Sequence, residues 1–372
     1  MKLIVLSLLL WLSWPAMGQI VELPITFVRG YGPFGVGFSR LTPDQRLDAN
    51  YRKMTLPVNG IPKAWISPQK AMVRINTWQL IYQNVLAGNV SSAWYKGYQH
   101  SRQLALDDAE FAKQPIKCYV YVVKGFEPKR GKWLVRIDTN NNLDLSDETS
   151  FEPQVIKPGA PADDITDARL VTYQTFQKGR IVTAQLPMVV KRMGDELFFN
   201  FPQYAQATLP QSEGQIDLVV SNGFLGMNFD DITTVARQPQ WFWQTKLATD
   251  ELTEIGGIIT LGGKRYKNKG VRTYANALEL EIPGSQSKEY SLTLGEVFPP
   301  FVAADFRTGK SISLAACKGK WVYIDFWGTW CKPCLATIPT LKRLYQGSNR
   351  ARIEFIGIAG NQDPQQLQRF LA

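Results

Sequence analysis

Hydrophobic and polar positions follow a strand pattern through the middle of the chain. Between residues 116 and 282, short segments alternate apolar with polar residues or are rich in β-branched and aromatic residues, and turn residues separate them. Examples are CYVYVVKG, KWLVRID, GRIVTAQLPMVV, QIDLVVSNG and GGIITLGG. Alternation with a period of two puts every second side chain on one face of a strand. The pattern therefore predicts a mainly β, antiparallel domain, sandwich or barrel-like.

The segment before these strands is less regular. Residues 19–115 mix turn residues with aromatic ones, and a helix is expected near Leu104 to Lys113. No repeat of fixed period is visible along the chain. We therefore assign residues 19–285 to one β-rich N-terminal domain of unknown function.

A different pattern follows the polar segment IPGSQSKEYS (282–291), where we expect a domain boundary. KWVYIDFWG (320–328) and IEFIGIAG (353–360) are apolar runs of the buried-strand kind, and each precedes a segment of helical character. Alternating strands and helices are typical of a parallel sheet with right-handed crossovers. Residues 286–372 are thus predicted to form an α/β domain.

The first eighteen residues have the pattern of a cleaved secretory signal. Lys2 precedes an apolar run from Leu3 to Trp14, and small residues follow. The alternative is a retained membrane anchor, although the run is shorter than the roughly 20 apolar residues that span a bilayer. We expect the mature protein to be periplasmic or secreted, and to meet a membrane only through an uncleaved signal peptide.

The formal net charge is +10 over 372 residues, which would attract acidic partners. The basic residues are nevertheless scattered, and the densest cluster, KRYKNKGVR (264–272), is interpreted as a solvated hairpin. No nucleic-acid partner is inferred.

The candidate chemistry is in FWGTWCKPC (326–334), where Cys331 and Cys334 are separated by Lys332 and Pro333. Two thiols at a helix start can close a small disulfide ring, and the helix N-terminus stabilises the thiolate of the first cysteine. Cys331 is then the exposed, attacking sulfur and Cys334 the resolving one. Zinc would need further ligands, and a permanent disulfide in so short a ring would add little stability.

These residues carry a resemblance to a known family. From Gly295 onward the chain resembles the thioredoxin-like, TlpA-type thiol:disulfide oxidoreductases that bacteria export. FWGTWCKPC, including Trp330, is similar to their active site, and Pro339 stands where their active-site helix has a kinking proline. The resemblance implies a thioredoxin fold, no required cofactor, a protein or small-molecule disulfide as substrate, and an electron-donating redox partner.

Asp325 lies six residues before Cys331, where thioredoxins have a buried aspartate. In an apolar strand its pKa should rise, so that it could accept the proton of Cys334, directly or through water. The alternative is a buried carboxylate with a structural role only. The TlpA-type branch often has a glutamate three residues after the second cysteine, and this chain has Thr337 there.

The family continues with a strand hairpin, whose entering loop carries a cis-proline, and a last helix. The last proline here, Pro364, comes too early for that role, so we expect the thioredoxin-like domain to be incomplete. Cys118 and Cys317 could pair or act as relays, but independent buried thiols are the favoured interpretation.

A second pattern is typical of a cation-binding loop. RIDTNNNLDLSDE (136–148) places oxygen-bearing residues at alternating positions, as the first half of an EF-hand loop does. Leu143 replaces the turn glycine, and Thr149 stands where a bidentate Glu is usual. A plain turn is the alternative, because Asn and Asp are common turn formers. The candidate Ca²⁺ ligands are Asp138, Asn140, Asn142, Asp144 and Glu148.

Two functions remain open from the sequence. The leading hypothesis is an exported thiol:disulfide oxidoreductase, a reductase or isomerase of protein disulfides. The alternative is an exported binding protein, whose β-rich domain binds a glycan or a protein partner while a partial thioredoxin domain stays inactive.

Overall fold

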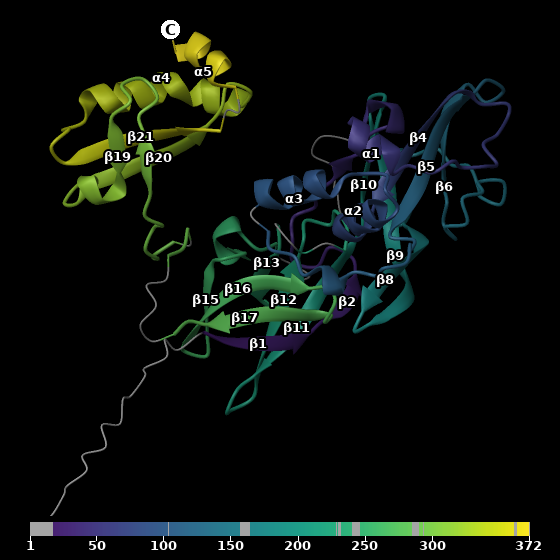
Figure 1. The fold of residues 1–372 in the computed structure, drawn as a ribbon, viewed down its shortest axis with the longest axis horizontal. Coiled ribbons are helices and arrows are strands. Elements are labelled where there is room, and N and C mark those ends of the chain that lie inside the picture. Colours follow the sequence, from purple (N-terminus) through teal and green to yellow (C-terminus); the bar gives the residue numbers. More distant parts are fainter. Residues whose placement is uncertain are drawn as a thin grey trace, which may run out of the picture. The chain divides into compact units, whose positions relative to one another are not determined.

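The computed structural model describes residues 18–102, 104–156, 164–227, 229, 232–239, 246–284, 290–292, 294–360 and 363–371. Residues 1–17 of the predicted signal peptide lie outside this range. The chain divides into two compact units, one ending at Glu296 and the other beginning at Val297 (Figure 1). The division falls later than the predicted boundary after residue 285.

The helices of the N-terminal unit are short and capped. Asp48, Asn76 and Ser91 each accept a hydrogen bond from a backbone N–H of the first turn, which satisfies donors that have no partner within the helix. The helices are α1 (Ala49–Lys53), α2 (Thr77–Leu86) and α3 (Ser92–Ser101).

The prediction of a helix near Leu104 to Lys113 is wrong. Only a 3-10 turn forms there, at Asp108–Glu110. The Asp107 carboxylate accepts a hydrogen bond from the N–H of Ala109, a local bond that competes with helical pairing. Leu104 and Phe111 still pack against a hydrophobic cluster, so the apolar spacing reflects burial of an irregular segment.

Two antiparallel sheets of the N-terminal unit pack against a common cluster that includes Leu218, Val235, Leu278 and Leu280. Alternating residues point into this cluster, as the sequence pattern predicted. The first sheet has the order β1 (Gln19–Pro24), β17 (Ala277–Ile282), β16 (Lys264–Arg272), β15 (Ile258–Leu261), and the second β14 (Thr253–Glu254), β13 (Thr234–Arg237), β12 (Gln215–Ser221), β11 (Gln203–Pro210), β2 (Thr26–Arg29).

Two further sheets share a second cluster, to which Val73, Val122, Leu186 and Phe199 belong. One has the order β4 (Ile66–Arg74), β5 (Tyr119–Glu127), β6 (Lys132–Ile137); the other has β3 (Ser39–Arg40), β10 (Glu196–Asn200), β9 (Arg180–Met193), β7 (Gln154–Val155), with β8 (Arg169–Gln177) also pairing with β9. The prediction of a strand-rich unit is confirmed. Among the described residues the sheets stay open, so the barrel-like closure is not found.

The C-terminal unit has the alternation that its sequence predicted. β20 (Trp321–Trp327) pairs in parallel with β21 (Ile353–Ala359), and α4 (Lys332–Gly347) connects them; α5 (Pro364–Leu371) follows. A short antiparallel hairpin precedes them, formed by β18 (Val302–Ala304) and β19 (Ser311–Ser313). Parallel pairing requires a long crossover, which the helix supplies.

The parallel strands are more open than the predicted buried-strand type. Trp321 is 81% exposed and Phe326 is 59% exposed, whereas Ile356 is buried. On one side, a cavity of about 710 Å³ lies between the two strands and α4. The side chains of β20 and β21 that line this cavity therefore remain partly accessible to solvent.

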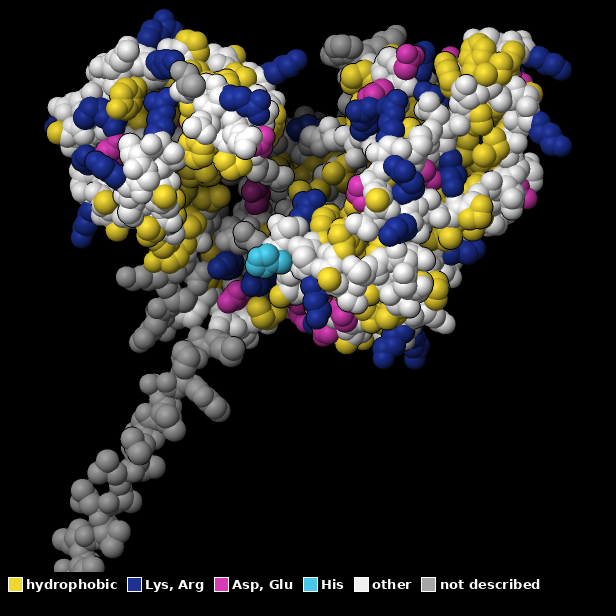
Figure 2. Space-filling model, turned by 45° about the horizontal axis from the view of Figure 1, so that its top comes forward, with side chains coloured by type: hydrophobic (Ala, Val, Ile, Leu, Met, Phe, Trp, Pro, Cys, Tyr) yellow, Lys and Arg dark blue, Asp and Glu magenta, His cyan; other side chains and the backbone are white. Residues whose placement is uncertain are grey.

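The surface has no concentrated basic region on the face that Figure 2 shows, because Lys and Arg side chains are scattered there among hydrophobic and polar ones. The cluster of residues 264–272 is the strand β16, in a hairpin with β15. None of the helices within the described ranges has the length and apolar character needed to cross a bilayer.

Candidate functional site

The cysteine pair lies where β20 has ended and α4 begins. Cys331 is the residue that precedes the helix, and Cys334 is in its first turn. The two form a disulfide, with their Cα atoms 5.3 Å apart. Pro333 is tolerated between them because the N–H groups in the first turn of a helix have no acceptor within the helix, so the N–H that proline lacks costs no helical hydrogen bond. The prediction that both cysteines lie at the start of a helix is confirmed.

A backbone donor faces the first sulfur. The N–H of Cys334 points at Sγ of Cys331, 3.3 Å away. Together with the helix dipole, this donor favours negative charge on Cys331 over Cys334. Both cysteines are half-buried, whereas Lys332 and Pro333 are exposed. The helix terminus, more than exposure, therefore distinguishes the two sulfurs.

Trp330 covers the turn that leads to the cysteines. Its indole is 71% exposed, and its N–H donates to the carbonyl of Gly360, 3.2 Å away. Gly328 lies directly against this ring, since a Cβ there would come within 2.7 Å of the indole nitrogen. Gly328 and Gly360 were not among the residues predicted for this site; the signal for each is a glycine directly after a strand.

Asp325 differs from its prediction. It lies on β20 opposite Gly357 in the parallel register, and it is half-buried on the wall of the 710 Å³ cavity, not enclosed in an apolar strand. The expectation of full burial is wrong because the cavity opens beside β20. The described lining of this cavity includes Trp327 and Ile338 but neither cysteine.

Thr337 and Pro339 both lie on α4. The hydroxyl of Thr337 donates to the carbonyl of Cys334, 2.7 Å away, so this side chain is bonded to its own helix. Pro339 stands inside the helix, as the sequence predicted.

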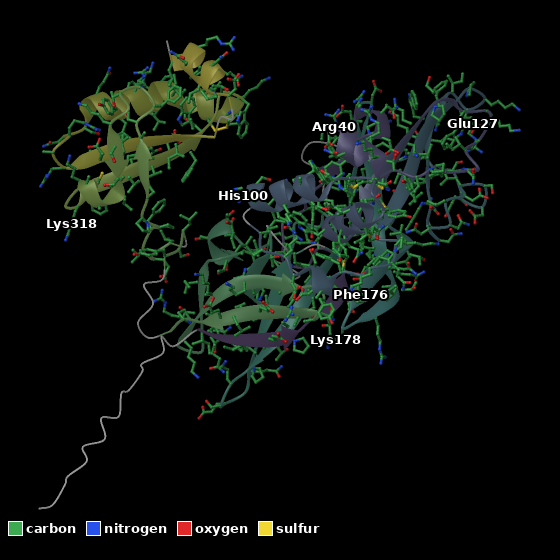
Figure 3. The ribbon with its side chains drawn as sticks, in the orientation of Figure 1. Arg40, His100, Glu127, Phe176, Lys178 and Lys318 are labelled. Carbon is green, nitrogen blue, oxygen red and sulfur yellow. A yellow bond between two sulfur atoms is a disulfide. The ribbon has the colours of Figure 1, made fainter. Side chains whose placement is uncertain are left out.

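The other two cysteines are free and buried, in different units. Cys118 is completely buried, and burial raises the pKa of its thiol, which disfavours the reactive thiolate. Cys317 precedes Lys318, which Figure 3 labels in the C-terminal unit, and its Sγ lies 3.6 Å from the carbonyl oxygen of Ser313. The interpretation of both as independent buried thiols is confirmed.

The candidate cation loop follows β6 and is held by its own hydrogen bonds. Asp138 is fully buried, and its two carboxylate oxygens accept from the N–H groups of Asn142 and Leu143. Burial raises the pKa of Asp138, and these two donors oppose the rise. At the far end of the loop, the Glu148 carboxylate accepts hydrogen bonds from the backbone N–H and the hydroxyl of Thr139.

One carboxylate in this loop was missed by the sequence analysis. Oδ2 of Asp147 accepts from the side-chain amides of Asn140 and Asn142, at 2.8 and 2.9 Å. Asp144 does not join them, because its Oδ1 accepts from the N–H of Ser146. No group of three or more His, Cys, Asp or Glu within the described residues could hold a metal ion. The calcium site stays a prediction.

Calcium is expected to raise the melting temperature of the N-terminal unit if the loop binds it. Rotation of the Asn140 and Asn142 amides would exchange their nitrogens for oxygens beside Asp147. Saturation at about 100 times Kd adds roughly 2.7 kcal/mol, or about 5 °C. The measurement is thermal unfolding in calcium and in chelator, with Asp147→Asn as the variant that should lose the shift. Identical melting curves would leave only a turn.

The strand–helix–strand order, with a disulfide-forming cysteine pair at the start of the first helix, defines the C-terminal segment as a thioredoxin-like domain. Residues 294–372 match the AhpC/TSA family. Of the N-terminal unit, the match reaches only the last three residues, 294–296.

The chain is also similar to named thiol-disulfide oxidoreductases. It is 36% identical over 88 residues to thiol-disulfide oxidoreductase ResA of Bacillus cereus, which is 24% of this chain and 50% of that protein. ResA of Halalkalibacterium halodurans is 36% identical over 77 residues, 21% of this chain and 43% of that protein. The chain thus spans about half the length of the curated relatives that it matches.

A solved structure of a protein from Bacteroides vulgatus shares 35% identity with this chain. The match covers 19% of this chain and 47% of that one, with a TM-score of 0.18, which supports no structural argument.

Proposed function

We propose that the protein is an exported thiol:disulfide oxidoreductase of the TlpA type, in which Cys331 and Cys334 exchange with a disulfide of a protein or a small molecule. The observation that carries the proposal is the disulfide between these cysteines at the N-terminus of α4. Similarity to ResA proteins over this segment supports the same chemistry.

The reaction balances between the two cysteines and one substrate disulfide. The thiolate of Cys331 attacks a substrate sulfur, the substrate S–S bond breaks, and one substrate thiolate leaves and takes up a proton. Cys334, deprotonated, then attacks Cys331 in the mixed disulfide and releases the second substrate thiol. The protein dithiol supplies two electrons and becomes the disulfide. A dithiol-type partner must reduce it again.

Asp325 is proposed to accept the proton of Cys334. Asp325 is half-buried on the wall of a cavity of about 710 Å³, which is large enough to hold the water molecules that would carry this proton. No cofactor is needed, because the two thiols hold both electrons.

Export is part of the proposal. The pattern of residues 1–18 supports a periplasmic or secreted location. A disulfide with an exposed neighbourhood persists more readily in such oxidising compartments.

The test is reduction of insulin disulfides by the protein in the presence of dithiothreitol. The protein is expected to accelerate the reaction above the rate with dithiothreitol alone, because a stabilised thiolate attacks faster at neutral pH. An Asp325→Asn variant should be slower by about tenfold in the step that releases substrate. Rates equal to those with the reagent alone would contradict the proposal.

The alternative function assigns the main role to the N-terminal unit, as a binding module for a glycan or a protein partner. Two observations favour it: this unit holds pockets with charged and aromatic side chains, and the match to the AhpC/TSA family leaves residues 1–293 uncovered. An insulin assay without activity would make this alternative the leading one.

A further inference from the structure

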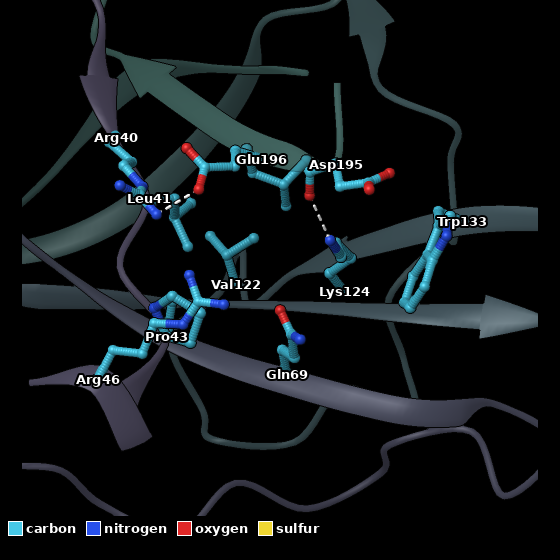
Figure 4. A pocket seen from close by; sticks show the side chains of 12 residues that line it. Arg40, Leu41, Pro43, Arg46, Gln69, Val122, Lys124, Trp133, Asp195 and Glu196 are labelled. Carbon is cyan, nitrogen blue, oxygen red and sulfur yellow. Dashed lines mark hydrogen bonds and ion pairs between the residues drawn. The ribbon is translucent and has the colours of Figure 1, made fainter. Parts of the chain in front are cut away.

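A cavity of about 320 Å³ opens on the N-terminal unit, between the loop that follows β3 and the strands β4, β5 and β10 (Figure 4). Its floor is apolar and buried, made by Leu41, Ala71, Val122 and Leu197. Polar side chains stand around this floor. A small apolar surface ringed by a few polar groups is the usual composition of a ligand site.

Arg46 lines this cavity with an exposed side chain. In Figure 4 its guanidinium lies beside Val122, with the amide of Gln69 on the same side. No hydrogen bond or ion pair with the described part of the chain occupies this guanidinium. By contrast, the neighbouring Arg40 is paired with the carboxylate of Glu196. Arg46 therefore has its donors available for a ligand.

Lys124 supplies a second positive charge from β5. Its Nζ donates to the backbone carbonyl of Asp195, 2.6 Å away, and lies 4.5 Å from the ring centre of Trp133. These contacts hold the ammonium at the cavity while leaving it further N–H donors. Burial lowers the pKa of Lys124, the charge of Asp195 opposes this, and the charge of Arg46 adds to the lowering. An anion between the two cations would offset their mutual repulsion.

The charges around the cavity favour a singly charged ligand. Arg40 and Glu196 neutralise each other, and the exposed carboxylate of Asp195 offsets one of the two remaining cations. One positive charge is left for a ligand to balance.

We propose that this cavity binds a small organic monocarboxylate, whose acid group lies between Arg46 and Lys124 and whose apolar body covers Val122. The planar fork of a guanidinium matches the two oxygens of a carboxylate. The amide of Gln69 can donate to the same acid group. The volume accommodates a molecule of about ten heavy atoms.

Benzoate is the probe for this site, and the measurement is calorimetric titration of the whole protein with ligand-observed NMR as a second readout. Benzoate is expected to bind saturably with a Kd in the millimolar range or below, as charged contacts with Arg46 and Lys124 and a small apolar surface allow. Benzamide, which has the same shape without the charge, should bind at least about tenfold more weakly.

Arg46→Gln is the decisive variant, because Arg46 is exposed and its guanidinium makes no hydrogen bond or ion pair with the described residues that the substitution would remove. It is expected to weaken benzoate binding at least about tenfold. Arg180→Gln is the matched control: it removes another exposed arginine, at the start of β9 and outside the cavity, and should leave the Kd unchanged. Circular dichroism of each variant monitors folding.

Four results would overturn the proposal. They are equal affinity of Arg46→Gln and the unchanged protein for benzoate, equal affinity for benzamide and benzoate, tighter binding of the dianion phenyl phosphate, and no saturable binding of benzoate below about 50 mM. None of these depends on the redox activity of the C-terminal unit.

Discussion

Replacing Cys331 with serine is expected to abolish disulfide reduction, with a loss of at least about 100-fold in the insulin assay. A serine hydroxyl at the start of α4 is a far weaker nucleophile than a thiolate. The N–H of Cys334 that now points at Sγ of Cys331 would face an oxygen that stays protonated. Helix capping by serine is favourable, so the fold should be retained.

Replacing Cys334 with serine should give a different result. Cys331 can still attack, but no second thiol resolves the mixed disulfide, so a covalent complex with the substrate should accumulate. Non-reducing gel electrophoresis and mass spectrometry of the trapped species measure it. Cys317→Ala is the matched control, because that thiol belongs to the same unit and is not in the disulfide. Trapping by Cys331→Ser in place of Cys334→Ser would reverse the assigned roles.

Replacing Leu218 with alanine is expected to destabilise the N-terminal unit by about 3 kcal/mol. Leu218 is completely buried on β12, in the cluster shared by the two sheets that β1 and β2 belong to. The substitution removes buried methyl groups and leaves a cavity that close-packed neighbours cannot fill. Chemical denaturation followed by circular dichroism measures the change. Leu170→Ala, at a side chain that is 48% exposed, should cost less than about 1 kcal/mol.

The same variant tests whether the two units act independently. Leu218 belongs to the N-terminal unit and the cysteine pair to the C-terminal one, so the insulin activity of Leu218→Ala should match that of the unchanged protein at temperatures where its N-terminal unit is folded. Loss of activity in parallel with unfolding of the N-terminal unit would mean that the redox chemistry depends on it.

The redox site was readable from the sequence because it is local. Cys331, Lys332, Pro333 and Cys334 are consecutive, and the bonds that form the site run within one helical turn. The parallel pair β20 and β21 was predictable for a similar reason, since two apolar runs with a helix between them allow few other arrangements.

The errors arose where distant contacts decide. Leu104 and Phe111 have a helix-like spacing, but packing against a cluster of other elements and the Asp107 bond hold them in an irregular segment. Asp325 stands in an apolar run, yet a cavity beside its strand leaves it half-buried. Neither outcome is visible in a local pattern.

By itself, the sequence determined the strand-rich character of the N-terminal unit, the thioredoxin-like order of the C-terminal one and the position of the cysteine pair, because periodicity and helix capping act over a few neighbouring residues. Only the tertiary structure decided that the sheets stay open and that Arg46 and Lys124 meet at one cavity. These two residues come from different elements and lie far apart along the chain. Their approach depends on how sheets stack over a shared core, a free-energy balance summed over many distant contacts.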